Sequence, residues 1–120
     1  MKEYIEKCLR HSITIEENVE VWDKLPLRYK GSYRLYSVYQ NKVKWLLAQP
    51  KEDLRLTALR KDRKQIEKVS GLNCAFYFTK LNHYSKDAMM NEGIPFIVVE
   101  KQVYLPFLGM ILSDKDDRRL

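Results

Sequence analysis

Hydrophobic and polar positions form their clearest pattern in the middle of the chain. Tyr33–Gln40 is rich in the aromatic and β-branched residues that favour strands, and Val43–Gln49 is an apolar run typical of a strand buried on both faces. Asn41-Lys42 between them predicts a tight turn. Pro50 ends the second run, because proline has no N–H to donate to a ladder. This segment therefore predicts a β-hairpin.

A helical period follows the hairpin. Glu52-Asp53 predicts the start of a helix, since acidic side chains stabilise helix N-termini, and the helix is expected to run to about Ser70. Gly71 is typical of the residue just after a helix. The apolar positions of this helix form one stripe, which comprises Leu56, Leu59, Ile66 and Val69. The helix is therefore predicted to be amphipathic.

Weaker patterns predict the remaining elements. Before the hairpin they predict a helix over Lys2–Arg10, an extended segment over Ser12–Trp22, and one or two helical turns over Leu25–Lys30 that end at Gly31. After the long helix they predict a strand over Cys74–Thr79, a helix capped by Asn82 or Ser85 that runs to about Asn91 and ends at Gly93, and a second hairpin of Ile94–Val99 and Gln102–Leu105. An apolar tail, Leu105–Leu108, is expected to pack on the sheet.

The order of these elements predicts the fold class. Strand, helix, strand, helix and strand follow one another from Val43 to Val99, which favours parallel pairing through crossover helices. The first hairpin adds antiparallel pairs. We therefore expect an α/β fold with a small mixed sheet of about five strands and helices packed on it, as one domain over residues 1–112. The charged residues 113–120 are typical of either a frayed terminus or the start of an interdomain linker.

Composition excludes several classes of protein. The chain has 120 residues, of which 45% are hydrophobic and 32% charged, as in soluble globular domains. Four Gly, four Pro and two Cys exclude collagen-like chains, low-complexity disorder and disulfide scaffolds. The apolar runs are too short to span a bilayer, and the charges throughout Met1–Arg10 argue against a signal peptide. A protein of the reducing cytoplasm is the expectation.

The net charge of +6 is concentrated in one part of the chain. Residues 25–80 hold 13 basic and four acidic side chains, whereas both flanking parts are slightly acidic. The long helix carries Arg60, Lys61, Arg63, Lys64 and Lys68, and the hairpin adds Arg34, Lys42 and Lys44 with Tyr33, Tyr36 and Tyr39 between them. One interpretation is nucleic-acid contact, with tyrosines stacking on bases. The other is a solvated helix face whose lysines are relieved by Asp62 and Glu67, with tyrosines packing across strands.

Motifs for catalysis and metal binding are sparse. The sequence has neither a G-x-S-x-G elbow nor a glycine-rich phosphate loop, and we expect no cofactor. Four residues have zinc-ligand chemistry, namely Cys8, His11, Cys74 and His83. Only Cys8 and His11 have a ligand-like spacing. Burial of both cysteines as small hydrophobic side chains is therefore the preferred interpretation, and no metal site is predicted.

A nuclease is the one enzyme class that the pattern keeps open. A hairpin followed by a helix and a strand resembles the core of restriction-endonuclease-like proteins, in which a carboxylate and an E-x-K motif hold Mg²⁺. Here Gln49-Pro50-Lys51 lies at the corresponding strand end, with Lys51 at the matching spacing. However, no acidic residue lies between Asp23 and Glu52, so the hairpin supplies no carboxylate. The preferred interpretation of Gln49-Pro50-Lys51 is therefore the end of a strand, because a magnesium site needs at least one carboxylate.

Several segments together resemble a known family. These are Gly93–Val99 with Gln102–Gly109, Leu25-Pro26-Leu27, and Leu46–Glu52. They resemble the N-terminal α/β domain of bacterial, mainly Gram-positive, proteins described as MarR-like winged-helix transcription regulators, and the similarity covers roughly residues 20–112. The resemblance implies a cytoplasmic regulator domain for sensing, dimerisation or partner contact, with the DNA-reading helix-turn-helix following it. It assigns no functional residue.

These observations lead to one leading hypothesis and two alternatives. The leading hypothesis is a non-catalytic regulatory domain of a DNA-binding transcription regulator, expected to form a homodimer. The alternatives are an active or degenerate restriction-endonuclease-like domain, and a binder of the phosphate backbone. Candidate contact residues for nucleic acid or a partner are Arg60, Lys61, Arg63, Lys64, Lys68 and Lys51. No small-molecule effector can be named from the sequence.

Overall fold

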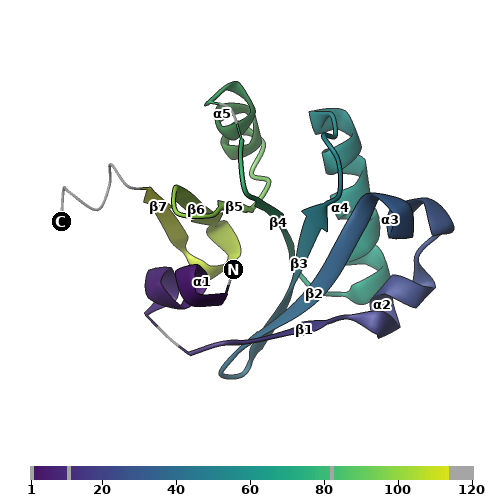
Figure 1. The fold of residues 1–120 in the computed structure, drawn as a ribbon, viewed down its shortest axis with the longest axis horizontal. Coiled ribbons are helices and arrows are strands. Elements are labelled where there is room, and N and C mark those ends of the chain that lie inside the picture. Colours follow the sequence, from purple (N-terminus) through teal and green to yellow (C-terminus); the bar gives the residue numbers. More distant parts are fainter. Residues whose placement is uncertain (1, 11, 82, 114–120) are drawn as a thin grey trace.

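The computed structural model describes residues 2–10, 12–81 and 83–113 (Figure 1). Its helices are α1 (Lys2–Leu9), α2 (Val19–Lys24), α3 (Leu27–Ser32), α4 (Leu56–Ser70), α5 (His83–Asn91) and a 3₁₀ turn, η1 (Pro106–Leu108). Its strands are β1 (Thr14–Glu17), β2 (Tyr33–Gln40), β3 (Val43–Pro50), β4 (Cys74–Phe78), β5 (Phe96–Val98), β6 (Gln102–Leu105) and β7 (Met110–Ser113). Within these ranges, no helix is both long and apolar enough to cross a bilayer.

The strands form one mixed sheet in which spatial order follows chain order, from β1 to β7. β1, β2 and β3 pair antiparallel, β3, β4 and β5 pair parallel, and β5, β6 and β7 pair antiparallel. The predicted α/β class, the mixed sheet and the crossover helices are therefore confirmed. The described part of the sheet has seven strands rather than about five, because β1 and β7 add an edge on each side.

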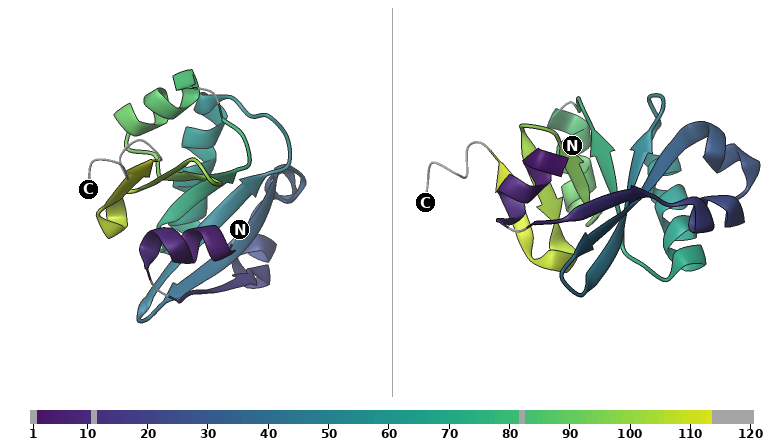
Figure 2. Two further views of the ribbon diagram at one scale, coloured as in Figure 1. Left: turned by 60° about the vertical axis from the view of Figure 1, so that its left-hand side comes forward. Right: turned by 60° about the horizontal axis from the view of Figure 1, so that its bottom comes forward.

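The two faces of the sheet are covered unequally (Figures 1 and 2). Leu46, Cys74 and Phe76 point to one face, where they pack with residues of α2, α3, α4 and α5. We call this the helical face. Trp45 and Leu47 point to the opposite face, where α1 and the segment around η1 cover them. We call this the α1 face. The strand alternation that the sequence predicts thus separates two cores on one sheet.

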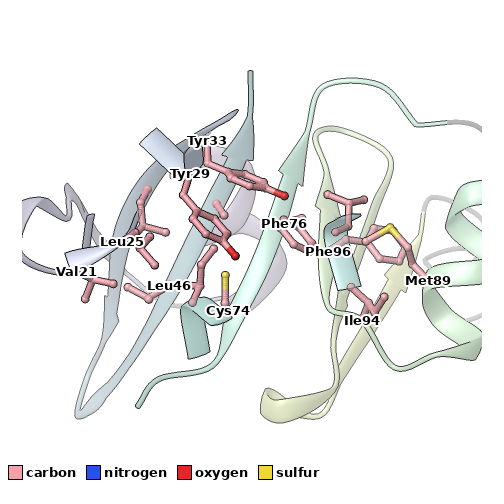
Figure 3. Packing of buried hydrophobic residues seen from close by; sticks show 14 of the residues in the cluster. Val21, Leu25, Tyr29, Tyr33, Leu46, Cys74, Phe76, Met89, Ile94 and Phe96 are labelled. Atoms are coloured by element: carbon pink, nitrogen blue, oxygen red, sulfur yellow. The ribbon is translucent and has the colours of Figure 1, made fainter. Parts of the chain in front are cut away.

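Aromatic rings form the centre of the helical face (Figure 3). The ring of Tyr33 lies between those of Tyr29 and Phe76, with centroid distances of 6.5 Å and 5.9 Å. Phe96 extends this packing to β5, where its ring lies 5.7 Å from that of Tyr104. Burial of such large rings contributes a substantial share of the favourable free energy of the core.

The predicted hairpin and helix ends are largely confirmed. β2 and β3 pair from Tyr33 opposite Pro50 to Gln40 opposite Val43, with Asn41 in the left-handed conformation at the turn. Gly71, with φ of 72°, ends α4 as predicted, and its N–H donates to the Glu67 carbonyl. The second predicted hairpin is present as β5 and β6.

The prediction of an extended segment over Ser12–Trp22 is wrong beyond residue 17. Val19–Lys24 forms α2, because Asn18 caps it: the Val21 N–H donates to Asn18 Oδ1 over 2.7 Å. The capping side chain is buried, and its Nδ2 donates to Ser37 Oγ on β2. The alternating valines suggested a strand, but the cap determines the local structure.

Three further boundaries differ from the prediction. Helix α4 begins at Leu56, so Glu52 and Asp53 lie in the preceding loop, outside the first helical turn. Gly31 lies inside α3, which continues to Ser32. The segment after Pro106 returns as β7, a strand that the sequence did not predict. The proposed cap residue Asn82 lies outside the described residues, as does the charged segment 114–120.

Candidate functional site

A pocket of about 930 Å³ opens where the parallel strands β3 and β4 end. Its walls come from the loops after these strands, the first two turns of α4, and α5, which stand on either side of this end of the sheet (Figure 1). Open α/β sheets bind ligands at the carboxyl ends of their parallel strands, usually where the strand order reverses. The order does not reverse in this sheet, and α4 and α5 pack on the same face. The volume of the pocket and its place at these strand ends make it the main candidate site.

The pocket is lined by apolar side chains, two of them buried, and by exposed charged side chains that we call its rim. The apolar side chains are those of Leu54, Leu56, Leu59, Phe78, Leu81 and Met89, of which Leu59 and Met89 are buried. The rim carries two basic and two acidic side chains, Lys51, Lys80, Glu52 and Asp53, all of them exposed. Gln49, Thr79 and Ser85 add further polar groups, so the lining is more polar than that of a typical small-molecule site.

Lys51 is held in place at this rim. Its N–H donates to the Ser32 carbonyl and its Nζ donates to the Lys30 carbonyl, both over 2.8 Å. These bonds tie the end of β3 to the end of α3, so one wall of the pocket is anchored to the neighbouring helix. Of the sequence-predicted contact residues, Lys51 is the one that lines the pocket.

The two arginines predicted as contact residues are both occupied in ion pairs. Arg60 binds Glu92, beyond the end of α5, through two hydrogen bonds, one of them 2.9 Å long. These bonds hold the pKa of the Glu92 carboxyl below its usual value. Arg63 pairs with Glu67 at 3.2 Å and donates from Nε to the Cys74 carbonyl. Both guanidinium groups therefore join α4 to its neighbours.

The predicted lysines of α4 lie apart from these pairs. Lys61, Lys64 and Lys68 are exposed, and none of them takes part in the ion pairs found among the described residues. The structure thus divides the five predicted cations of α4 into two arginines with structural partners and three outward lysines.

The buried side of α4 carries a carboxylate that the sequence analysis did not identify as buried. Asp62 is 1% exposed, and it accepts hydrogen bonds from Tyr33 Oη over 2.7 Å and from Arg28 over 2.8 Å. Burial and this carboxylate raise the pKa of the Tyr33 hydroxyl, which stays a donor. The spacing in the sequence indicates this burial, because position 62 lies on the same helix face as Leu59 and Ile66. The expectation that Asp62 relieves the surface lysines is wrong.

The tyrosines of β2 do not form one stacking surface. Tyr33 is buried in the helical face, whereas Tyr36 packs on the α1 face. The ring of Tyr39 lies 5.3 Å from the ammonium of Lys44, its partner across the hairpin. The interpretation as packing residues is confirmed, since consecutive side chains of a strand point to opposite faces.

The cysteines are also separated by the sheet. Cys74 is buried in the helical face, and Cys8 packs against the α1 face, so the two cannot share a zinc ion. Burial raises the pKa of the Cys74 thiol, which disfavours the reactive thiolate. His11 lies outside the described residues. Among the residues that the structure describes, no group of three His, Cys, Asp or Glu side chains could hold a metal ion.

Most residues of the pocket were not predicted as site residues. The chain order offered one signal, because parallel strands joined by crossover helices bring the loops after Pro50 and Phe78 to one edge. Comparison with known proteins adds no assignment: no protein-family model, curated protein or solved structure matches the chain.

Proposed function

We propose that this domain is a non-catalytic sensing domain of a bacterial transcription regulator, in which the pocket at the ends of β3 and β4 binds an amphipathic small molecule. The pocket carries the proposal. Its lining combines apolar side chains with ammonium, carboxylate and other polar groups in about equal measure, a combination suited to a ligand with a short apolar part and a charged head.

The position of the pocket supports a regulatory role. It is bounded by α4 on one side and α5 on the other, and Arg60 on α4 is joined to Glu92 beyond α5. A ligand that fills the pocket would contact both helices and change their relative stability. The resemblance to the N-terminal domain of MarR-like regulators supports the same role, together with a cytoplasmic location and a homodimer. A monomeric mass in light scattering at high concentration would contradict the dimer.

A thermal-shift screen tests this function. The panel contains acids, amines and zwitterions that each carry a short apolar chain, since the rim offers both charge signs. A true ligand at about 100 times its Kd stabilises the folded state by about 2.7 kcal/mol, which raises the Tm of a domain of this size by about 10 °C.

Matched variants locate the effect. Leu54→Trp places a large ring in the pocket and should abolish the shift. Leu27→Trp makes the same change on the exposed side of α3, where Leu27 is 81% exposed, and should preserve the shift. A ligand that stabilises the two variants equally binds elsewhere and would contradict the proposal.

A nuclease is the second candidate, and one observation favours it. The pocket brings Gln49 and Lys51 together with Glu52 and Asp53, so the loop supplies the carboxylates that the hairpin lacks. Another observation weighs against it. Arg34 lies directly opposite Gln49 in the β2–β3 register, so the cross-strand neighbour of Gln49 is a cation and not an oxygen ligand.

We therefore expect no cleavage of plasmid DNA by this domain in millimolar Mg²⁺. The measurement compares the wild type with Lys51→Ala on an agarose gel. Cleavage by the wild type that disappears in Lys51→Ala would replace the sensing proposal with the nuclease, whereas equal cleavage by both proteins indicates a contaminant.

A further inference from the structure

We propose that Lys61, Lys64 and Lys68 form a contact surface for the phosphate backbone of nucleic acid, which we call the lysine stripe. It lies on the outward side of α4 and is separate from the pocket, which α4 lines with Leu56 and Leu59. The proposal does not depend on the sensing function.

Helix geometry places the three ammonium groups in a row. Residues three and seven positions apart share one face of a helix, and a separation of seven residues spans about 10 Å along the axis. All three side chains are exposed. A duplex carries one phosphate per about 3.4 Å on each strand, so a row of this length faces several phosphates.

The acidic residues of α4 do not neutralise this row. Asp62 is buried and accepts hydrogen bonds from Tyr33 and Arg28. Glu67 pairs with Arg63 and accepts the Cys74 N–H over 2.9 Å. Both carboxylates are therefore engaged by other elements of the fold.

Uncompensated like charges at this spacing destabilise a helix. The position of Lys68 is explained by helix stability, because this lysine lies in the last turn of α4 and interacts favourably with the helix dipole. Lys61 and Lys64 lie farther from that end. Their common orientation is therefore better explained by an external polyanion.

The chemistry of the stripe favours nucleic acid over an acidic protein. Protein interfaces are centred on apolar and aromatic anchors, and the large exposed hydrophobic side chains of the described residues all lie on other elements. Lysine binds phosphate as a compact point charge, whereas the planar fork of arginine is better suited to bidentate contacts with a base edge. The two arginines of α4 that lie near the stripe are already bound. The expected interaction is thus independent of base sequence.

Fluorescence anisotropy with a labelled duplex of about 20 base pairs and mixed sequence tests the proposal. Three phosphate contacts predict a slope of about −2.7 for log K against log salt, so the affinity should fall about 40-fold between 50 and 200 mM salt. The triple variant Lys61→Gln, Lys64→Gln, Lys68→Gln should lose this binding, and each single change should reduce the slope by about 0.9.

A matched triple variant shows whether duplex binding depends on the position of the lysines or only on the net charge of the protein. Lys2→Gln, Lys7→Gln and Lys101→Gln remove the same charge from exposed positions elsewhere and should leave the affinity within about twofold, because salt screens distant charges. Arg60→Gln should also retain the affinity, since its guanidinium is bound to Glu92. Thermal unfolding of each variant shows that it is folded.

Three results would overturn the proposal. Equal loss in both triple variants would assign the effect to net charge alone. A flat salt dependence of the wild type, or no binding at millimolar protein, would exclude a phosphate contact. Binding of polyglutamate that depends on the same three lysines, without binding of the duplex, would assign the stripe to an acidic protein.

Discussion

Replacing Arg28 by Met and Tyr33 by Phe together should lower the free energy of unfolding by about 3–5 kcal/mol. These two residues supply the hydrogen bonds to the buried carboxylate of Asp62, from α3 and β2 respectively. Their removal leaves a charge inside the helical face without either of these hydrogen bonds. Tyr33→Phe alone should cost about 1–3 kcal/mol, because Arg28, although exposed, still donates a hydrogen bond to the carboxylate.

A third substitution makes this explanation specific. Adding Asp62→Leu to the double variant should restore most of the lost stability, since position 62 lies between Leu59 and Ile66 in the buried stripe. Urea unfolding followed by the fluorescence of the buried Trp45 measures all the variants. A double variant that loses less than about 1 kcal/mol, or a triple variant that is no more stable than the double, would contradict a structural role for the carboxylate.

Asn18→Ala should lower the free energy of unfolding by about 2–3 kcal/mol. The substitution removes the acceptor for the Val21 N–H at the start of α2 and the donor to Ser37 on β2. The Val21 N–H and the Ser37 hydroxyl, which each lose a partner, belong to buried residues. Ser37→Ala removes only the second bond and should cost about 1 kcal/mol.

Amide hydrogen exchange distinguishes the cap from general destabilisation. In Asn18→Ala the Val21 amide should exchange much faster relative to the amides of β3, whereas in Ser37→Ala its relative protection should be kept. If Asn18→Ala changes all amides by the same factor, the side chain does not act as a helix cap.

The central part of the fold could be predicted because local and long-range signals agree there. β2 and β3 combine strand propensity with a turn at Asn41, and Gly71 ends α4 with the backbone angle that glycine adopts readily. The parallel pairing of β3, β4 and β5 followed from the alternation of strands with helices. In these segments tertiary packing strengthens what the sequence pattern indicates.

The errors occur where one tertiary contact outweighs the pattern. Val19 and Val21 alternate as in a strand, yet the bond of Asn18 to Ser37 stabilises a helix start at that point. Glu52 and Asp53 are typical of a helix start but lie in the loop that borders the pocket. The Asn18 cap is a local signal that the alternation of valines concealed, whereas its bond to Ser37 depends on a residue far along the chain.

The candidate site was predictable in part for the same reason. Charge counting identified α4, but only the structure separates Arg60 and Arg63, which pair with Glu92 and Glu67, from the outward lysines. The pocket depends on where the loops after β3 and β4 meet, which follows from topology rather than from a motif. Its residue types, mainly leucines with scattered charges, are common in any α/β domain.

Methionine methyl NMR tests the central claim, that the pocket binds a ligand, most directly. Met89 is buried and lines the pocket. Its neighbour Met90 faces β6 instead, where its sulfur accepts a hydrogen bond of 3.2 Å from Gln102 Nε2. With methyl-labelled protein, the account predicts that a ligand from the thermal-shift screen moves the Met89 signal and leaves that of Met90 nearly unchanged. A saturating ligand that leaves the Met89 methyl signal unmoved would contradict the account.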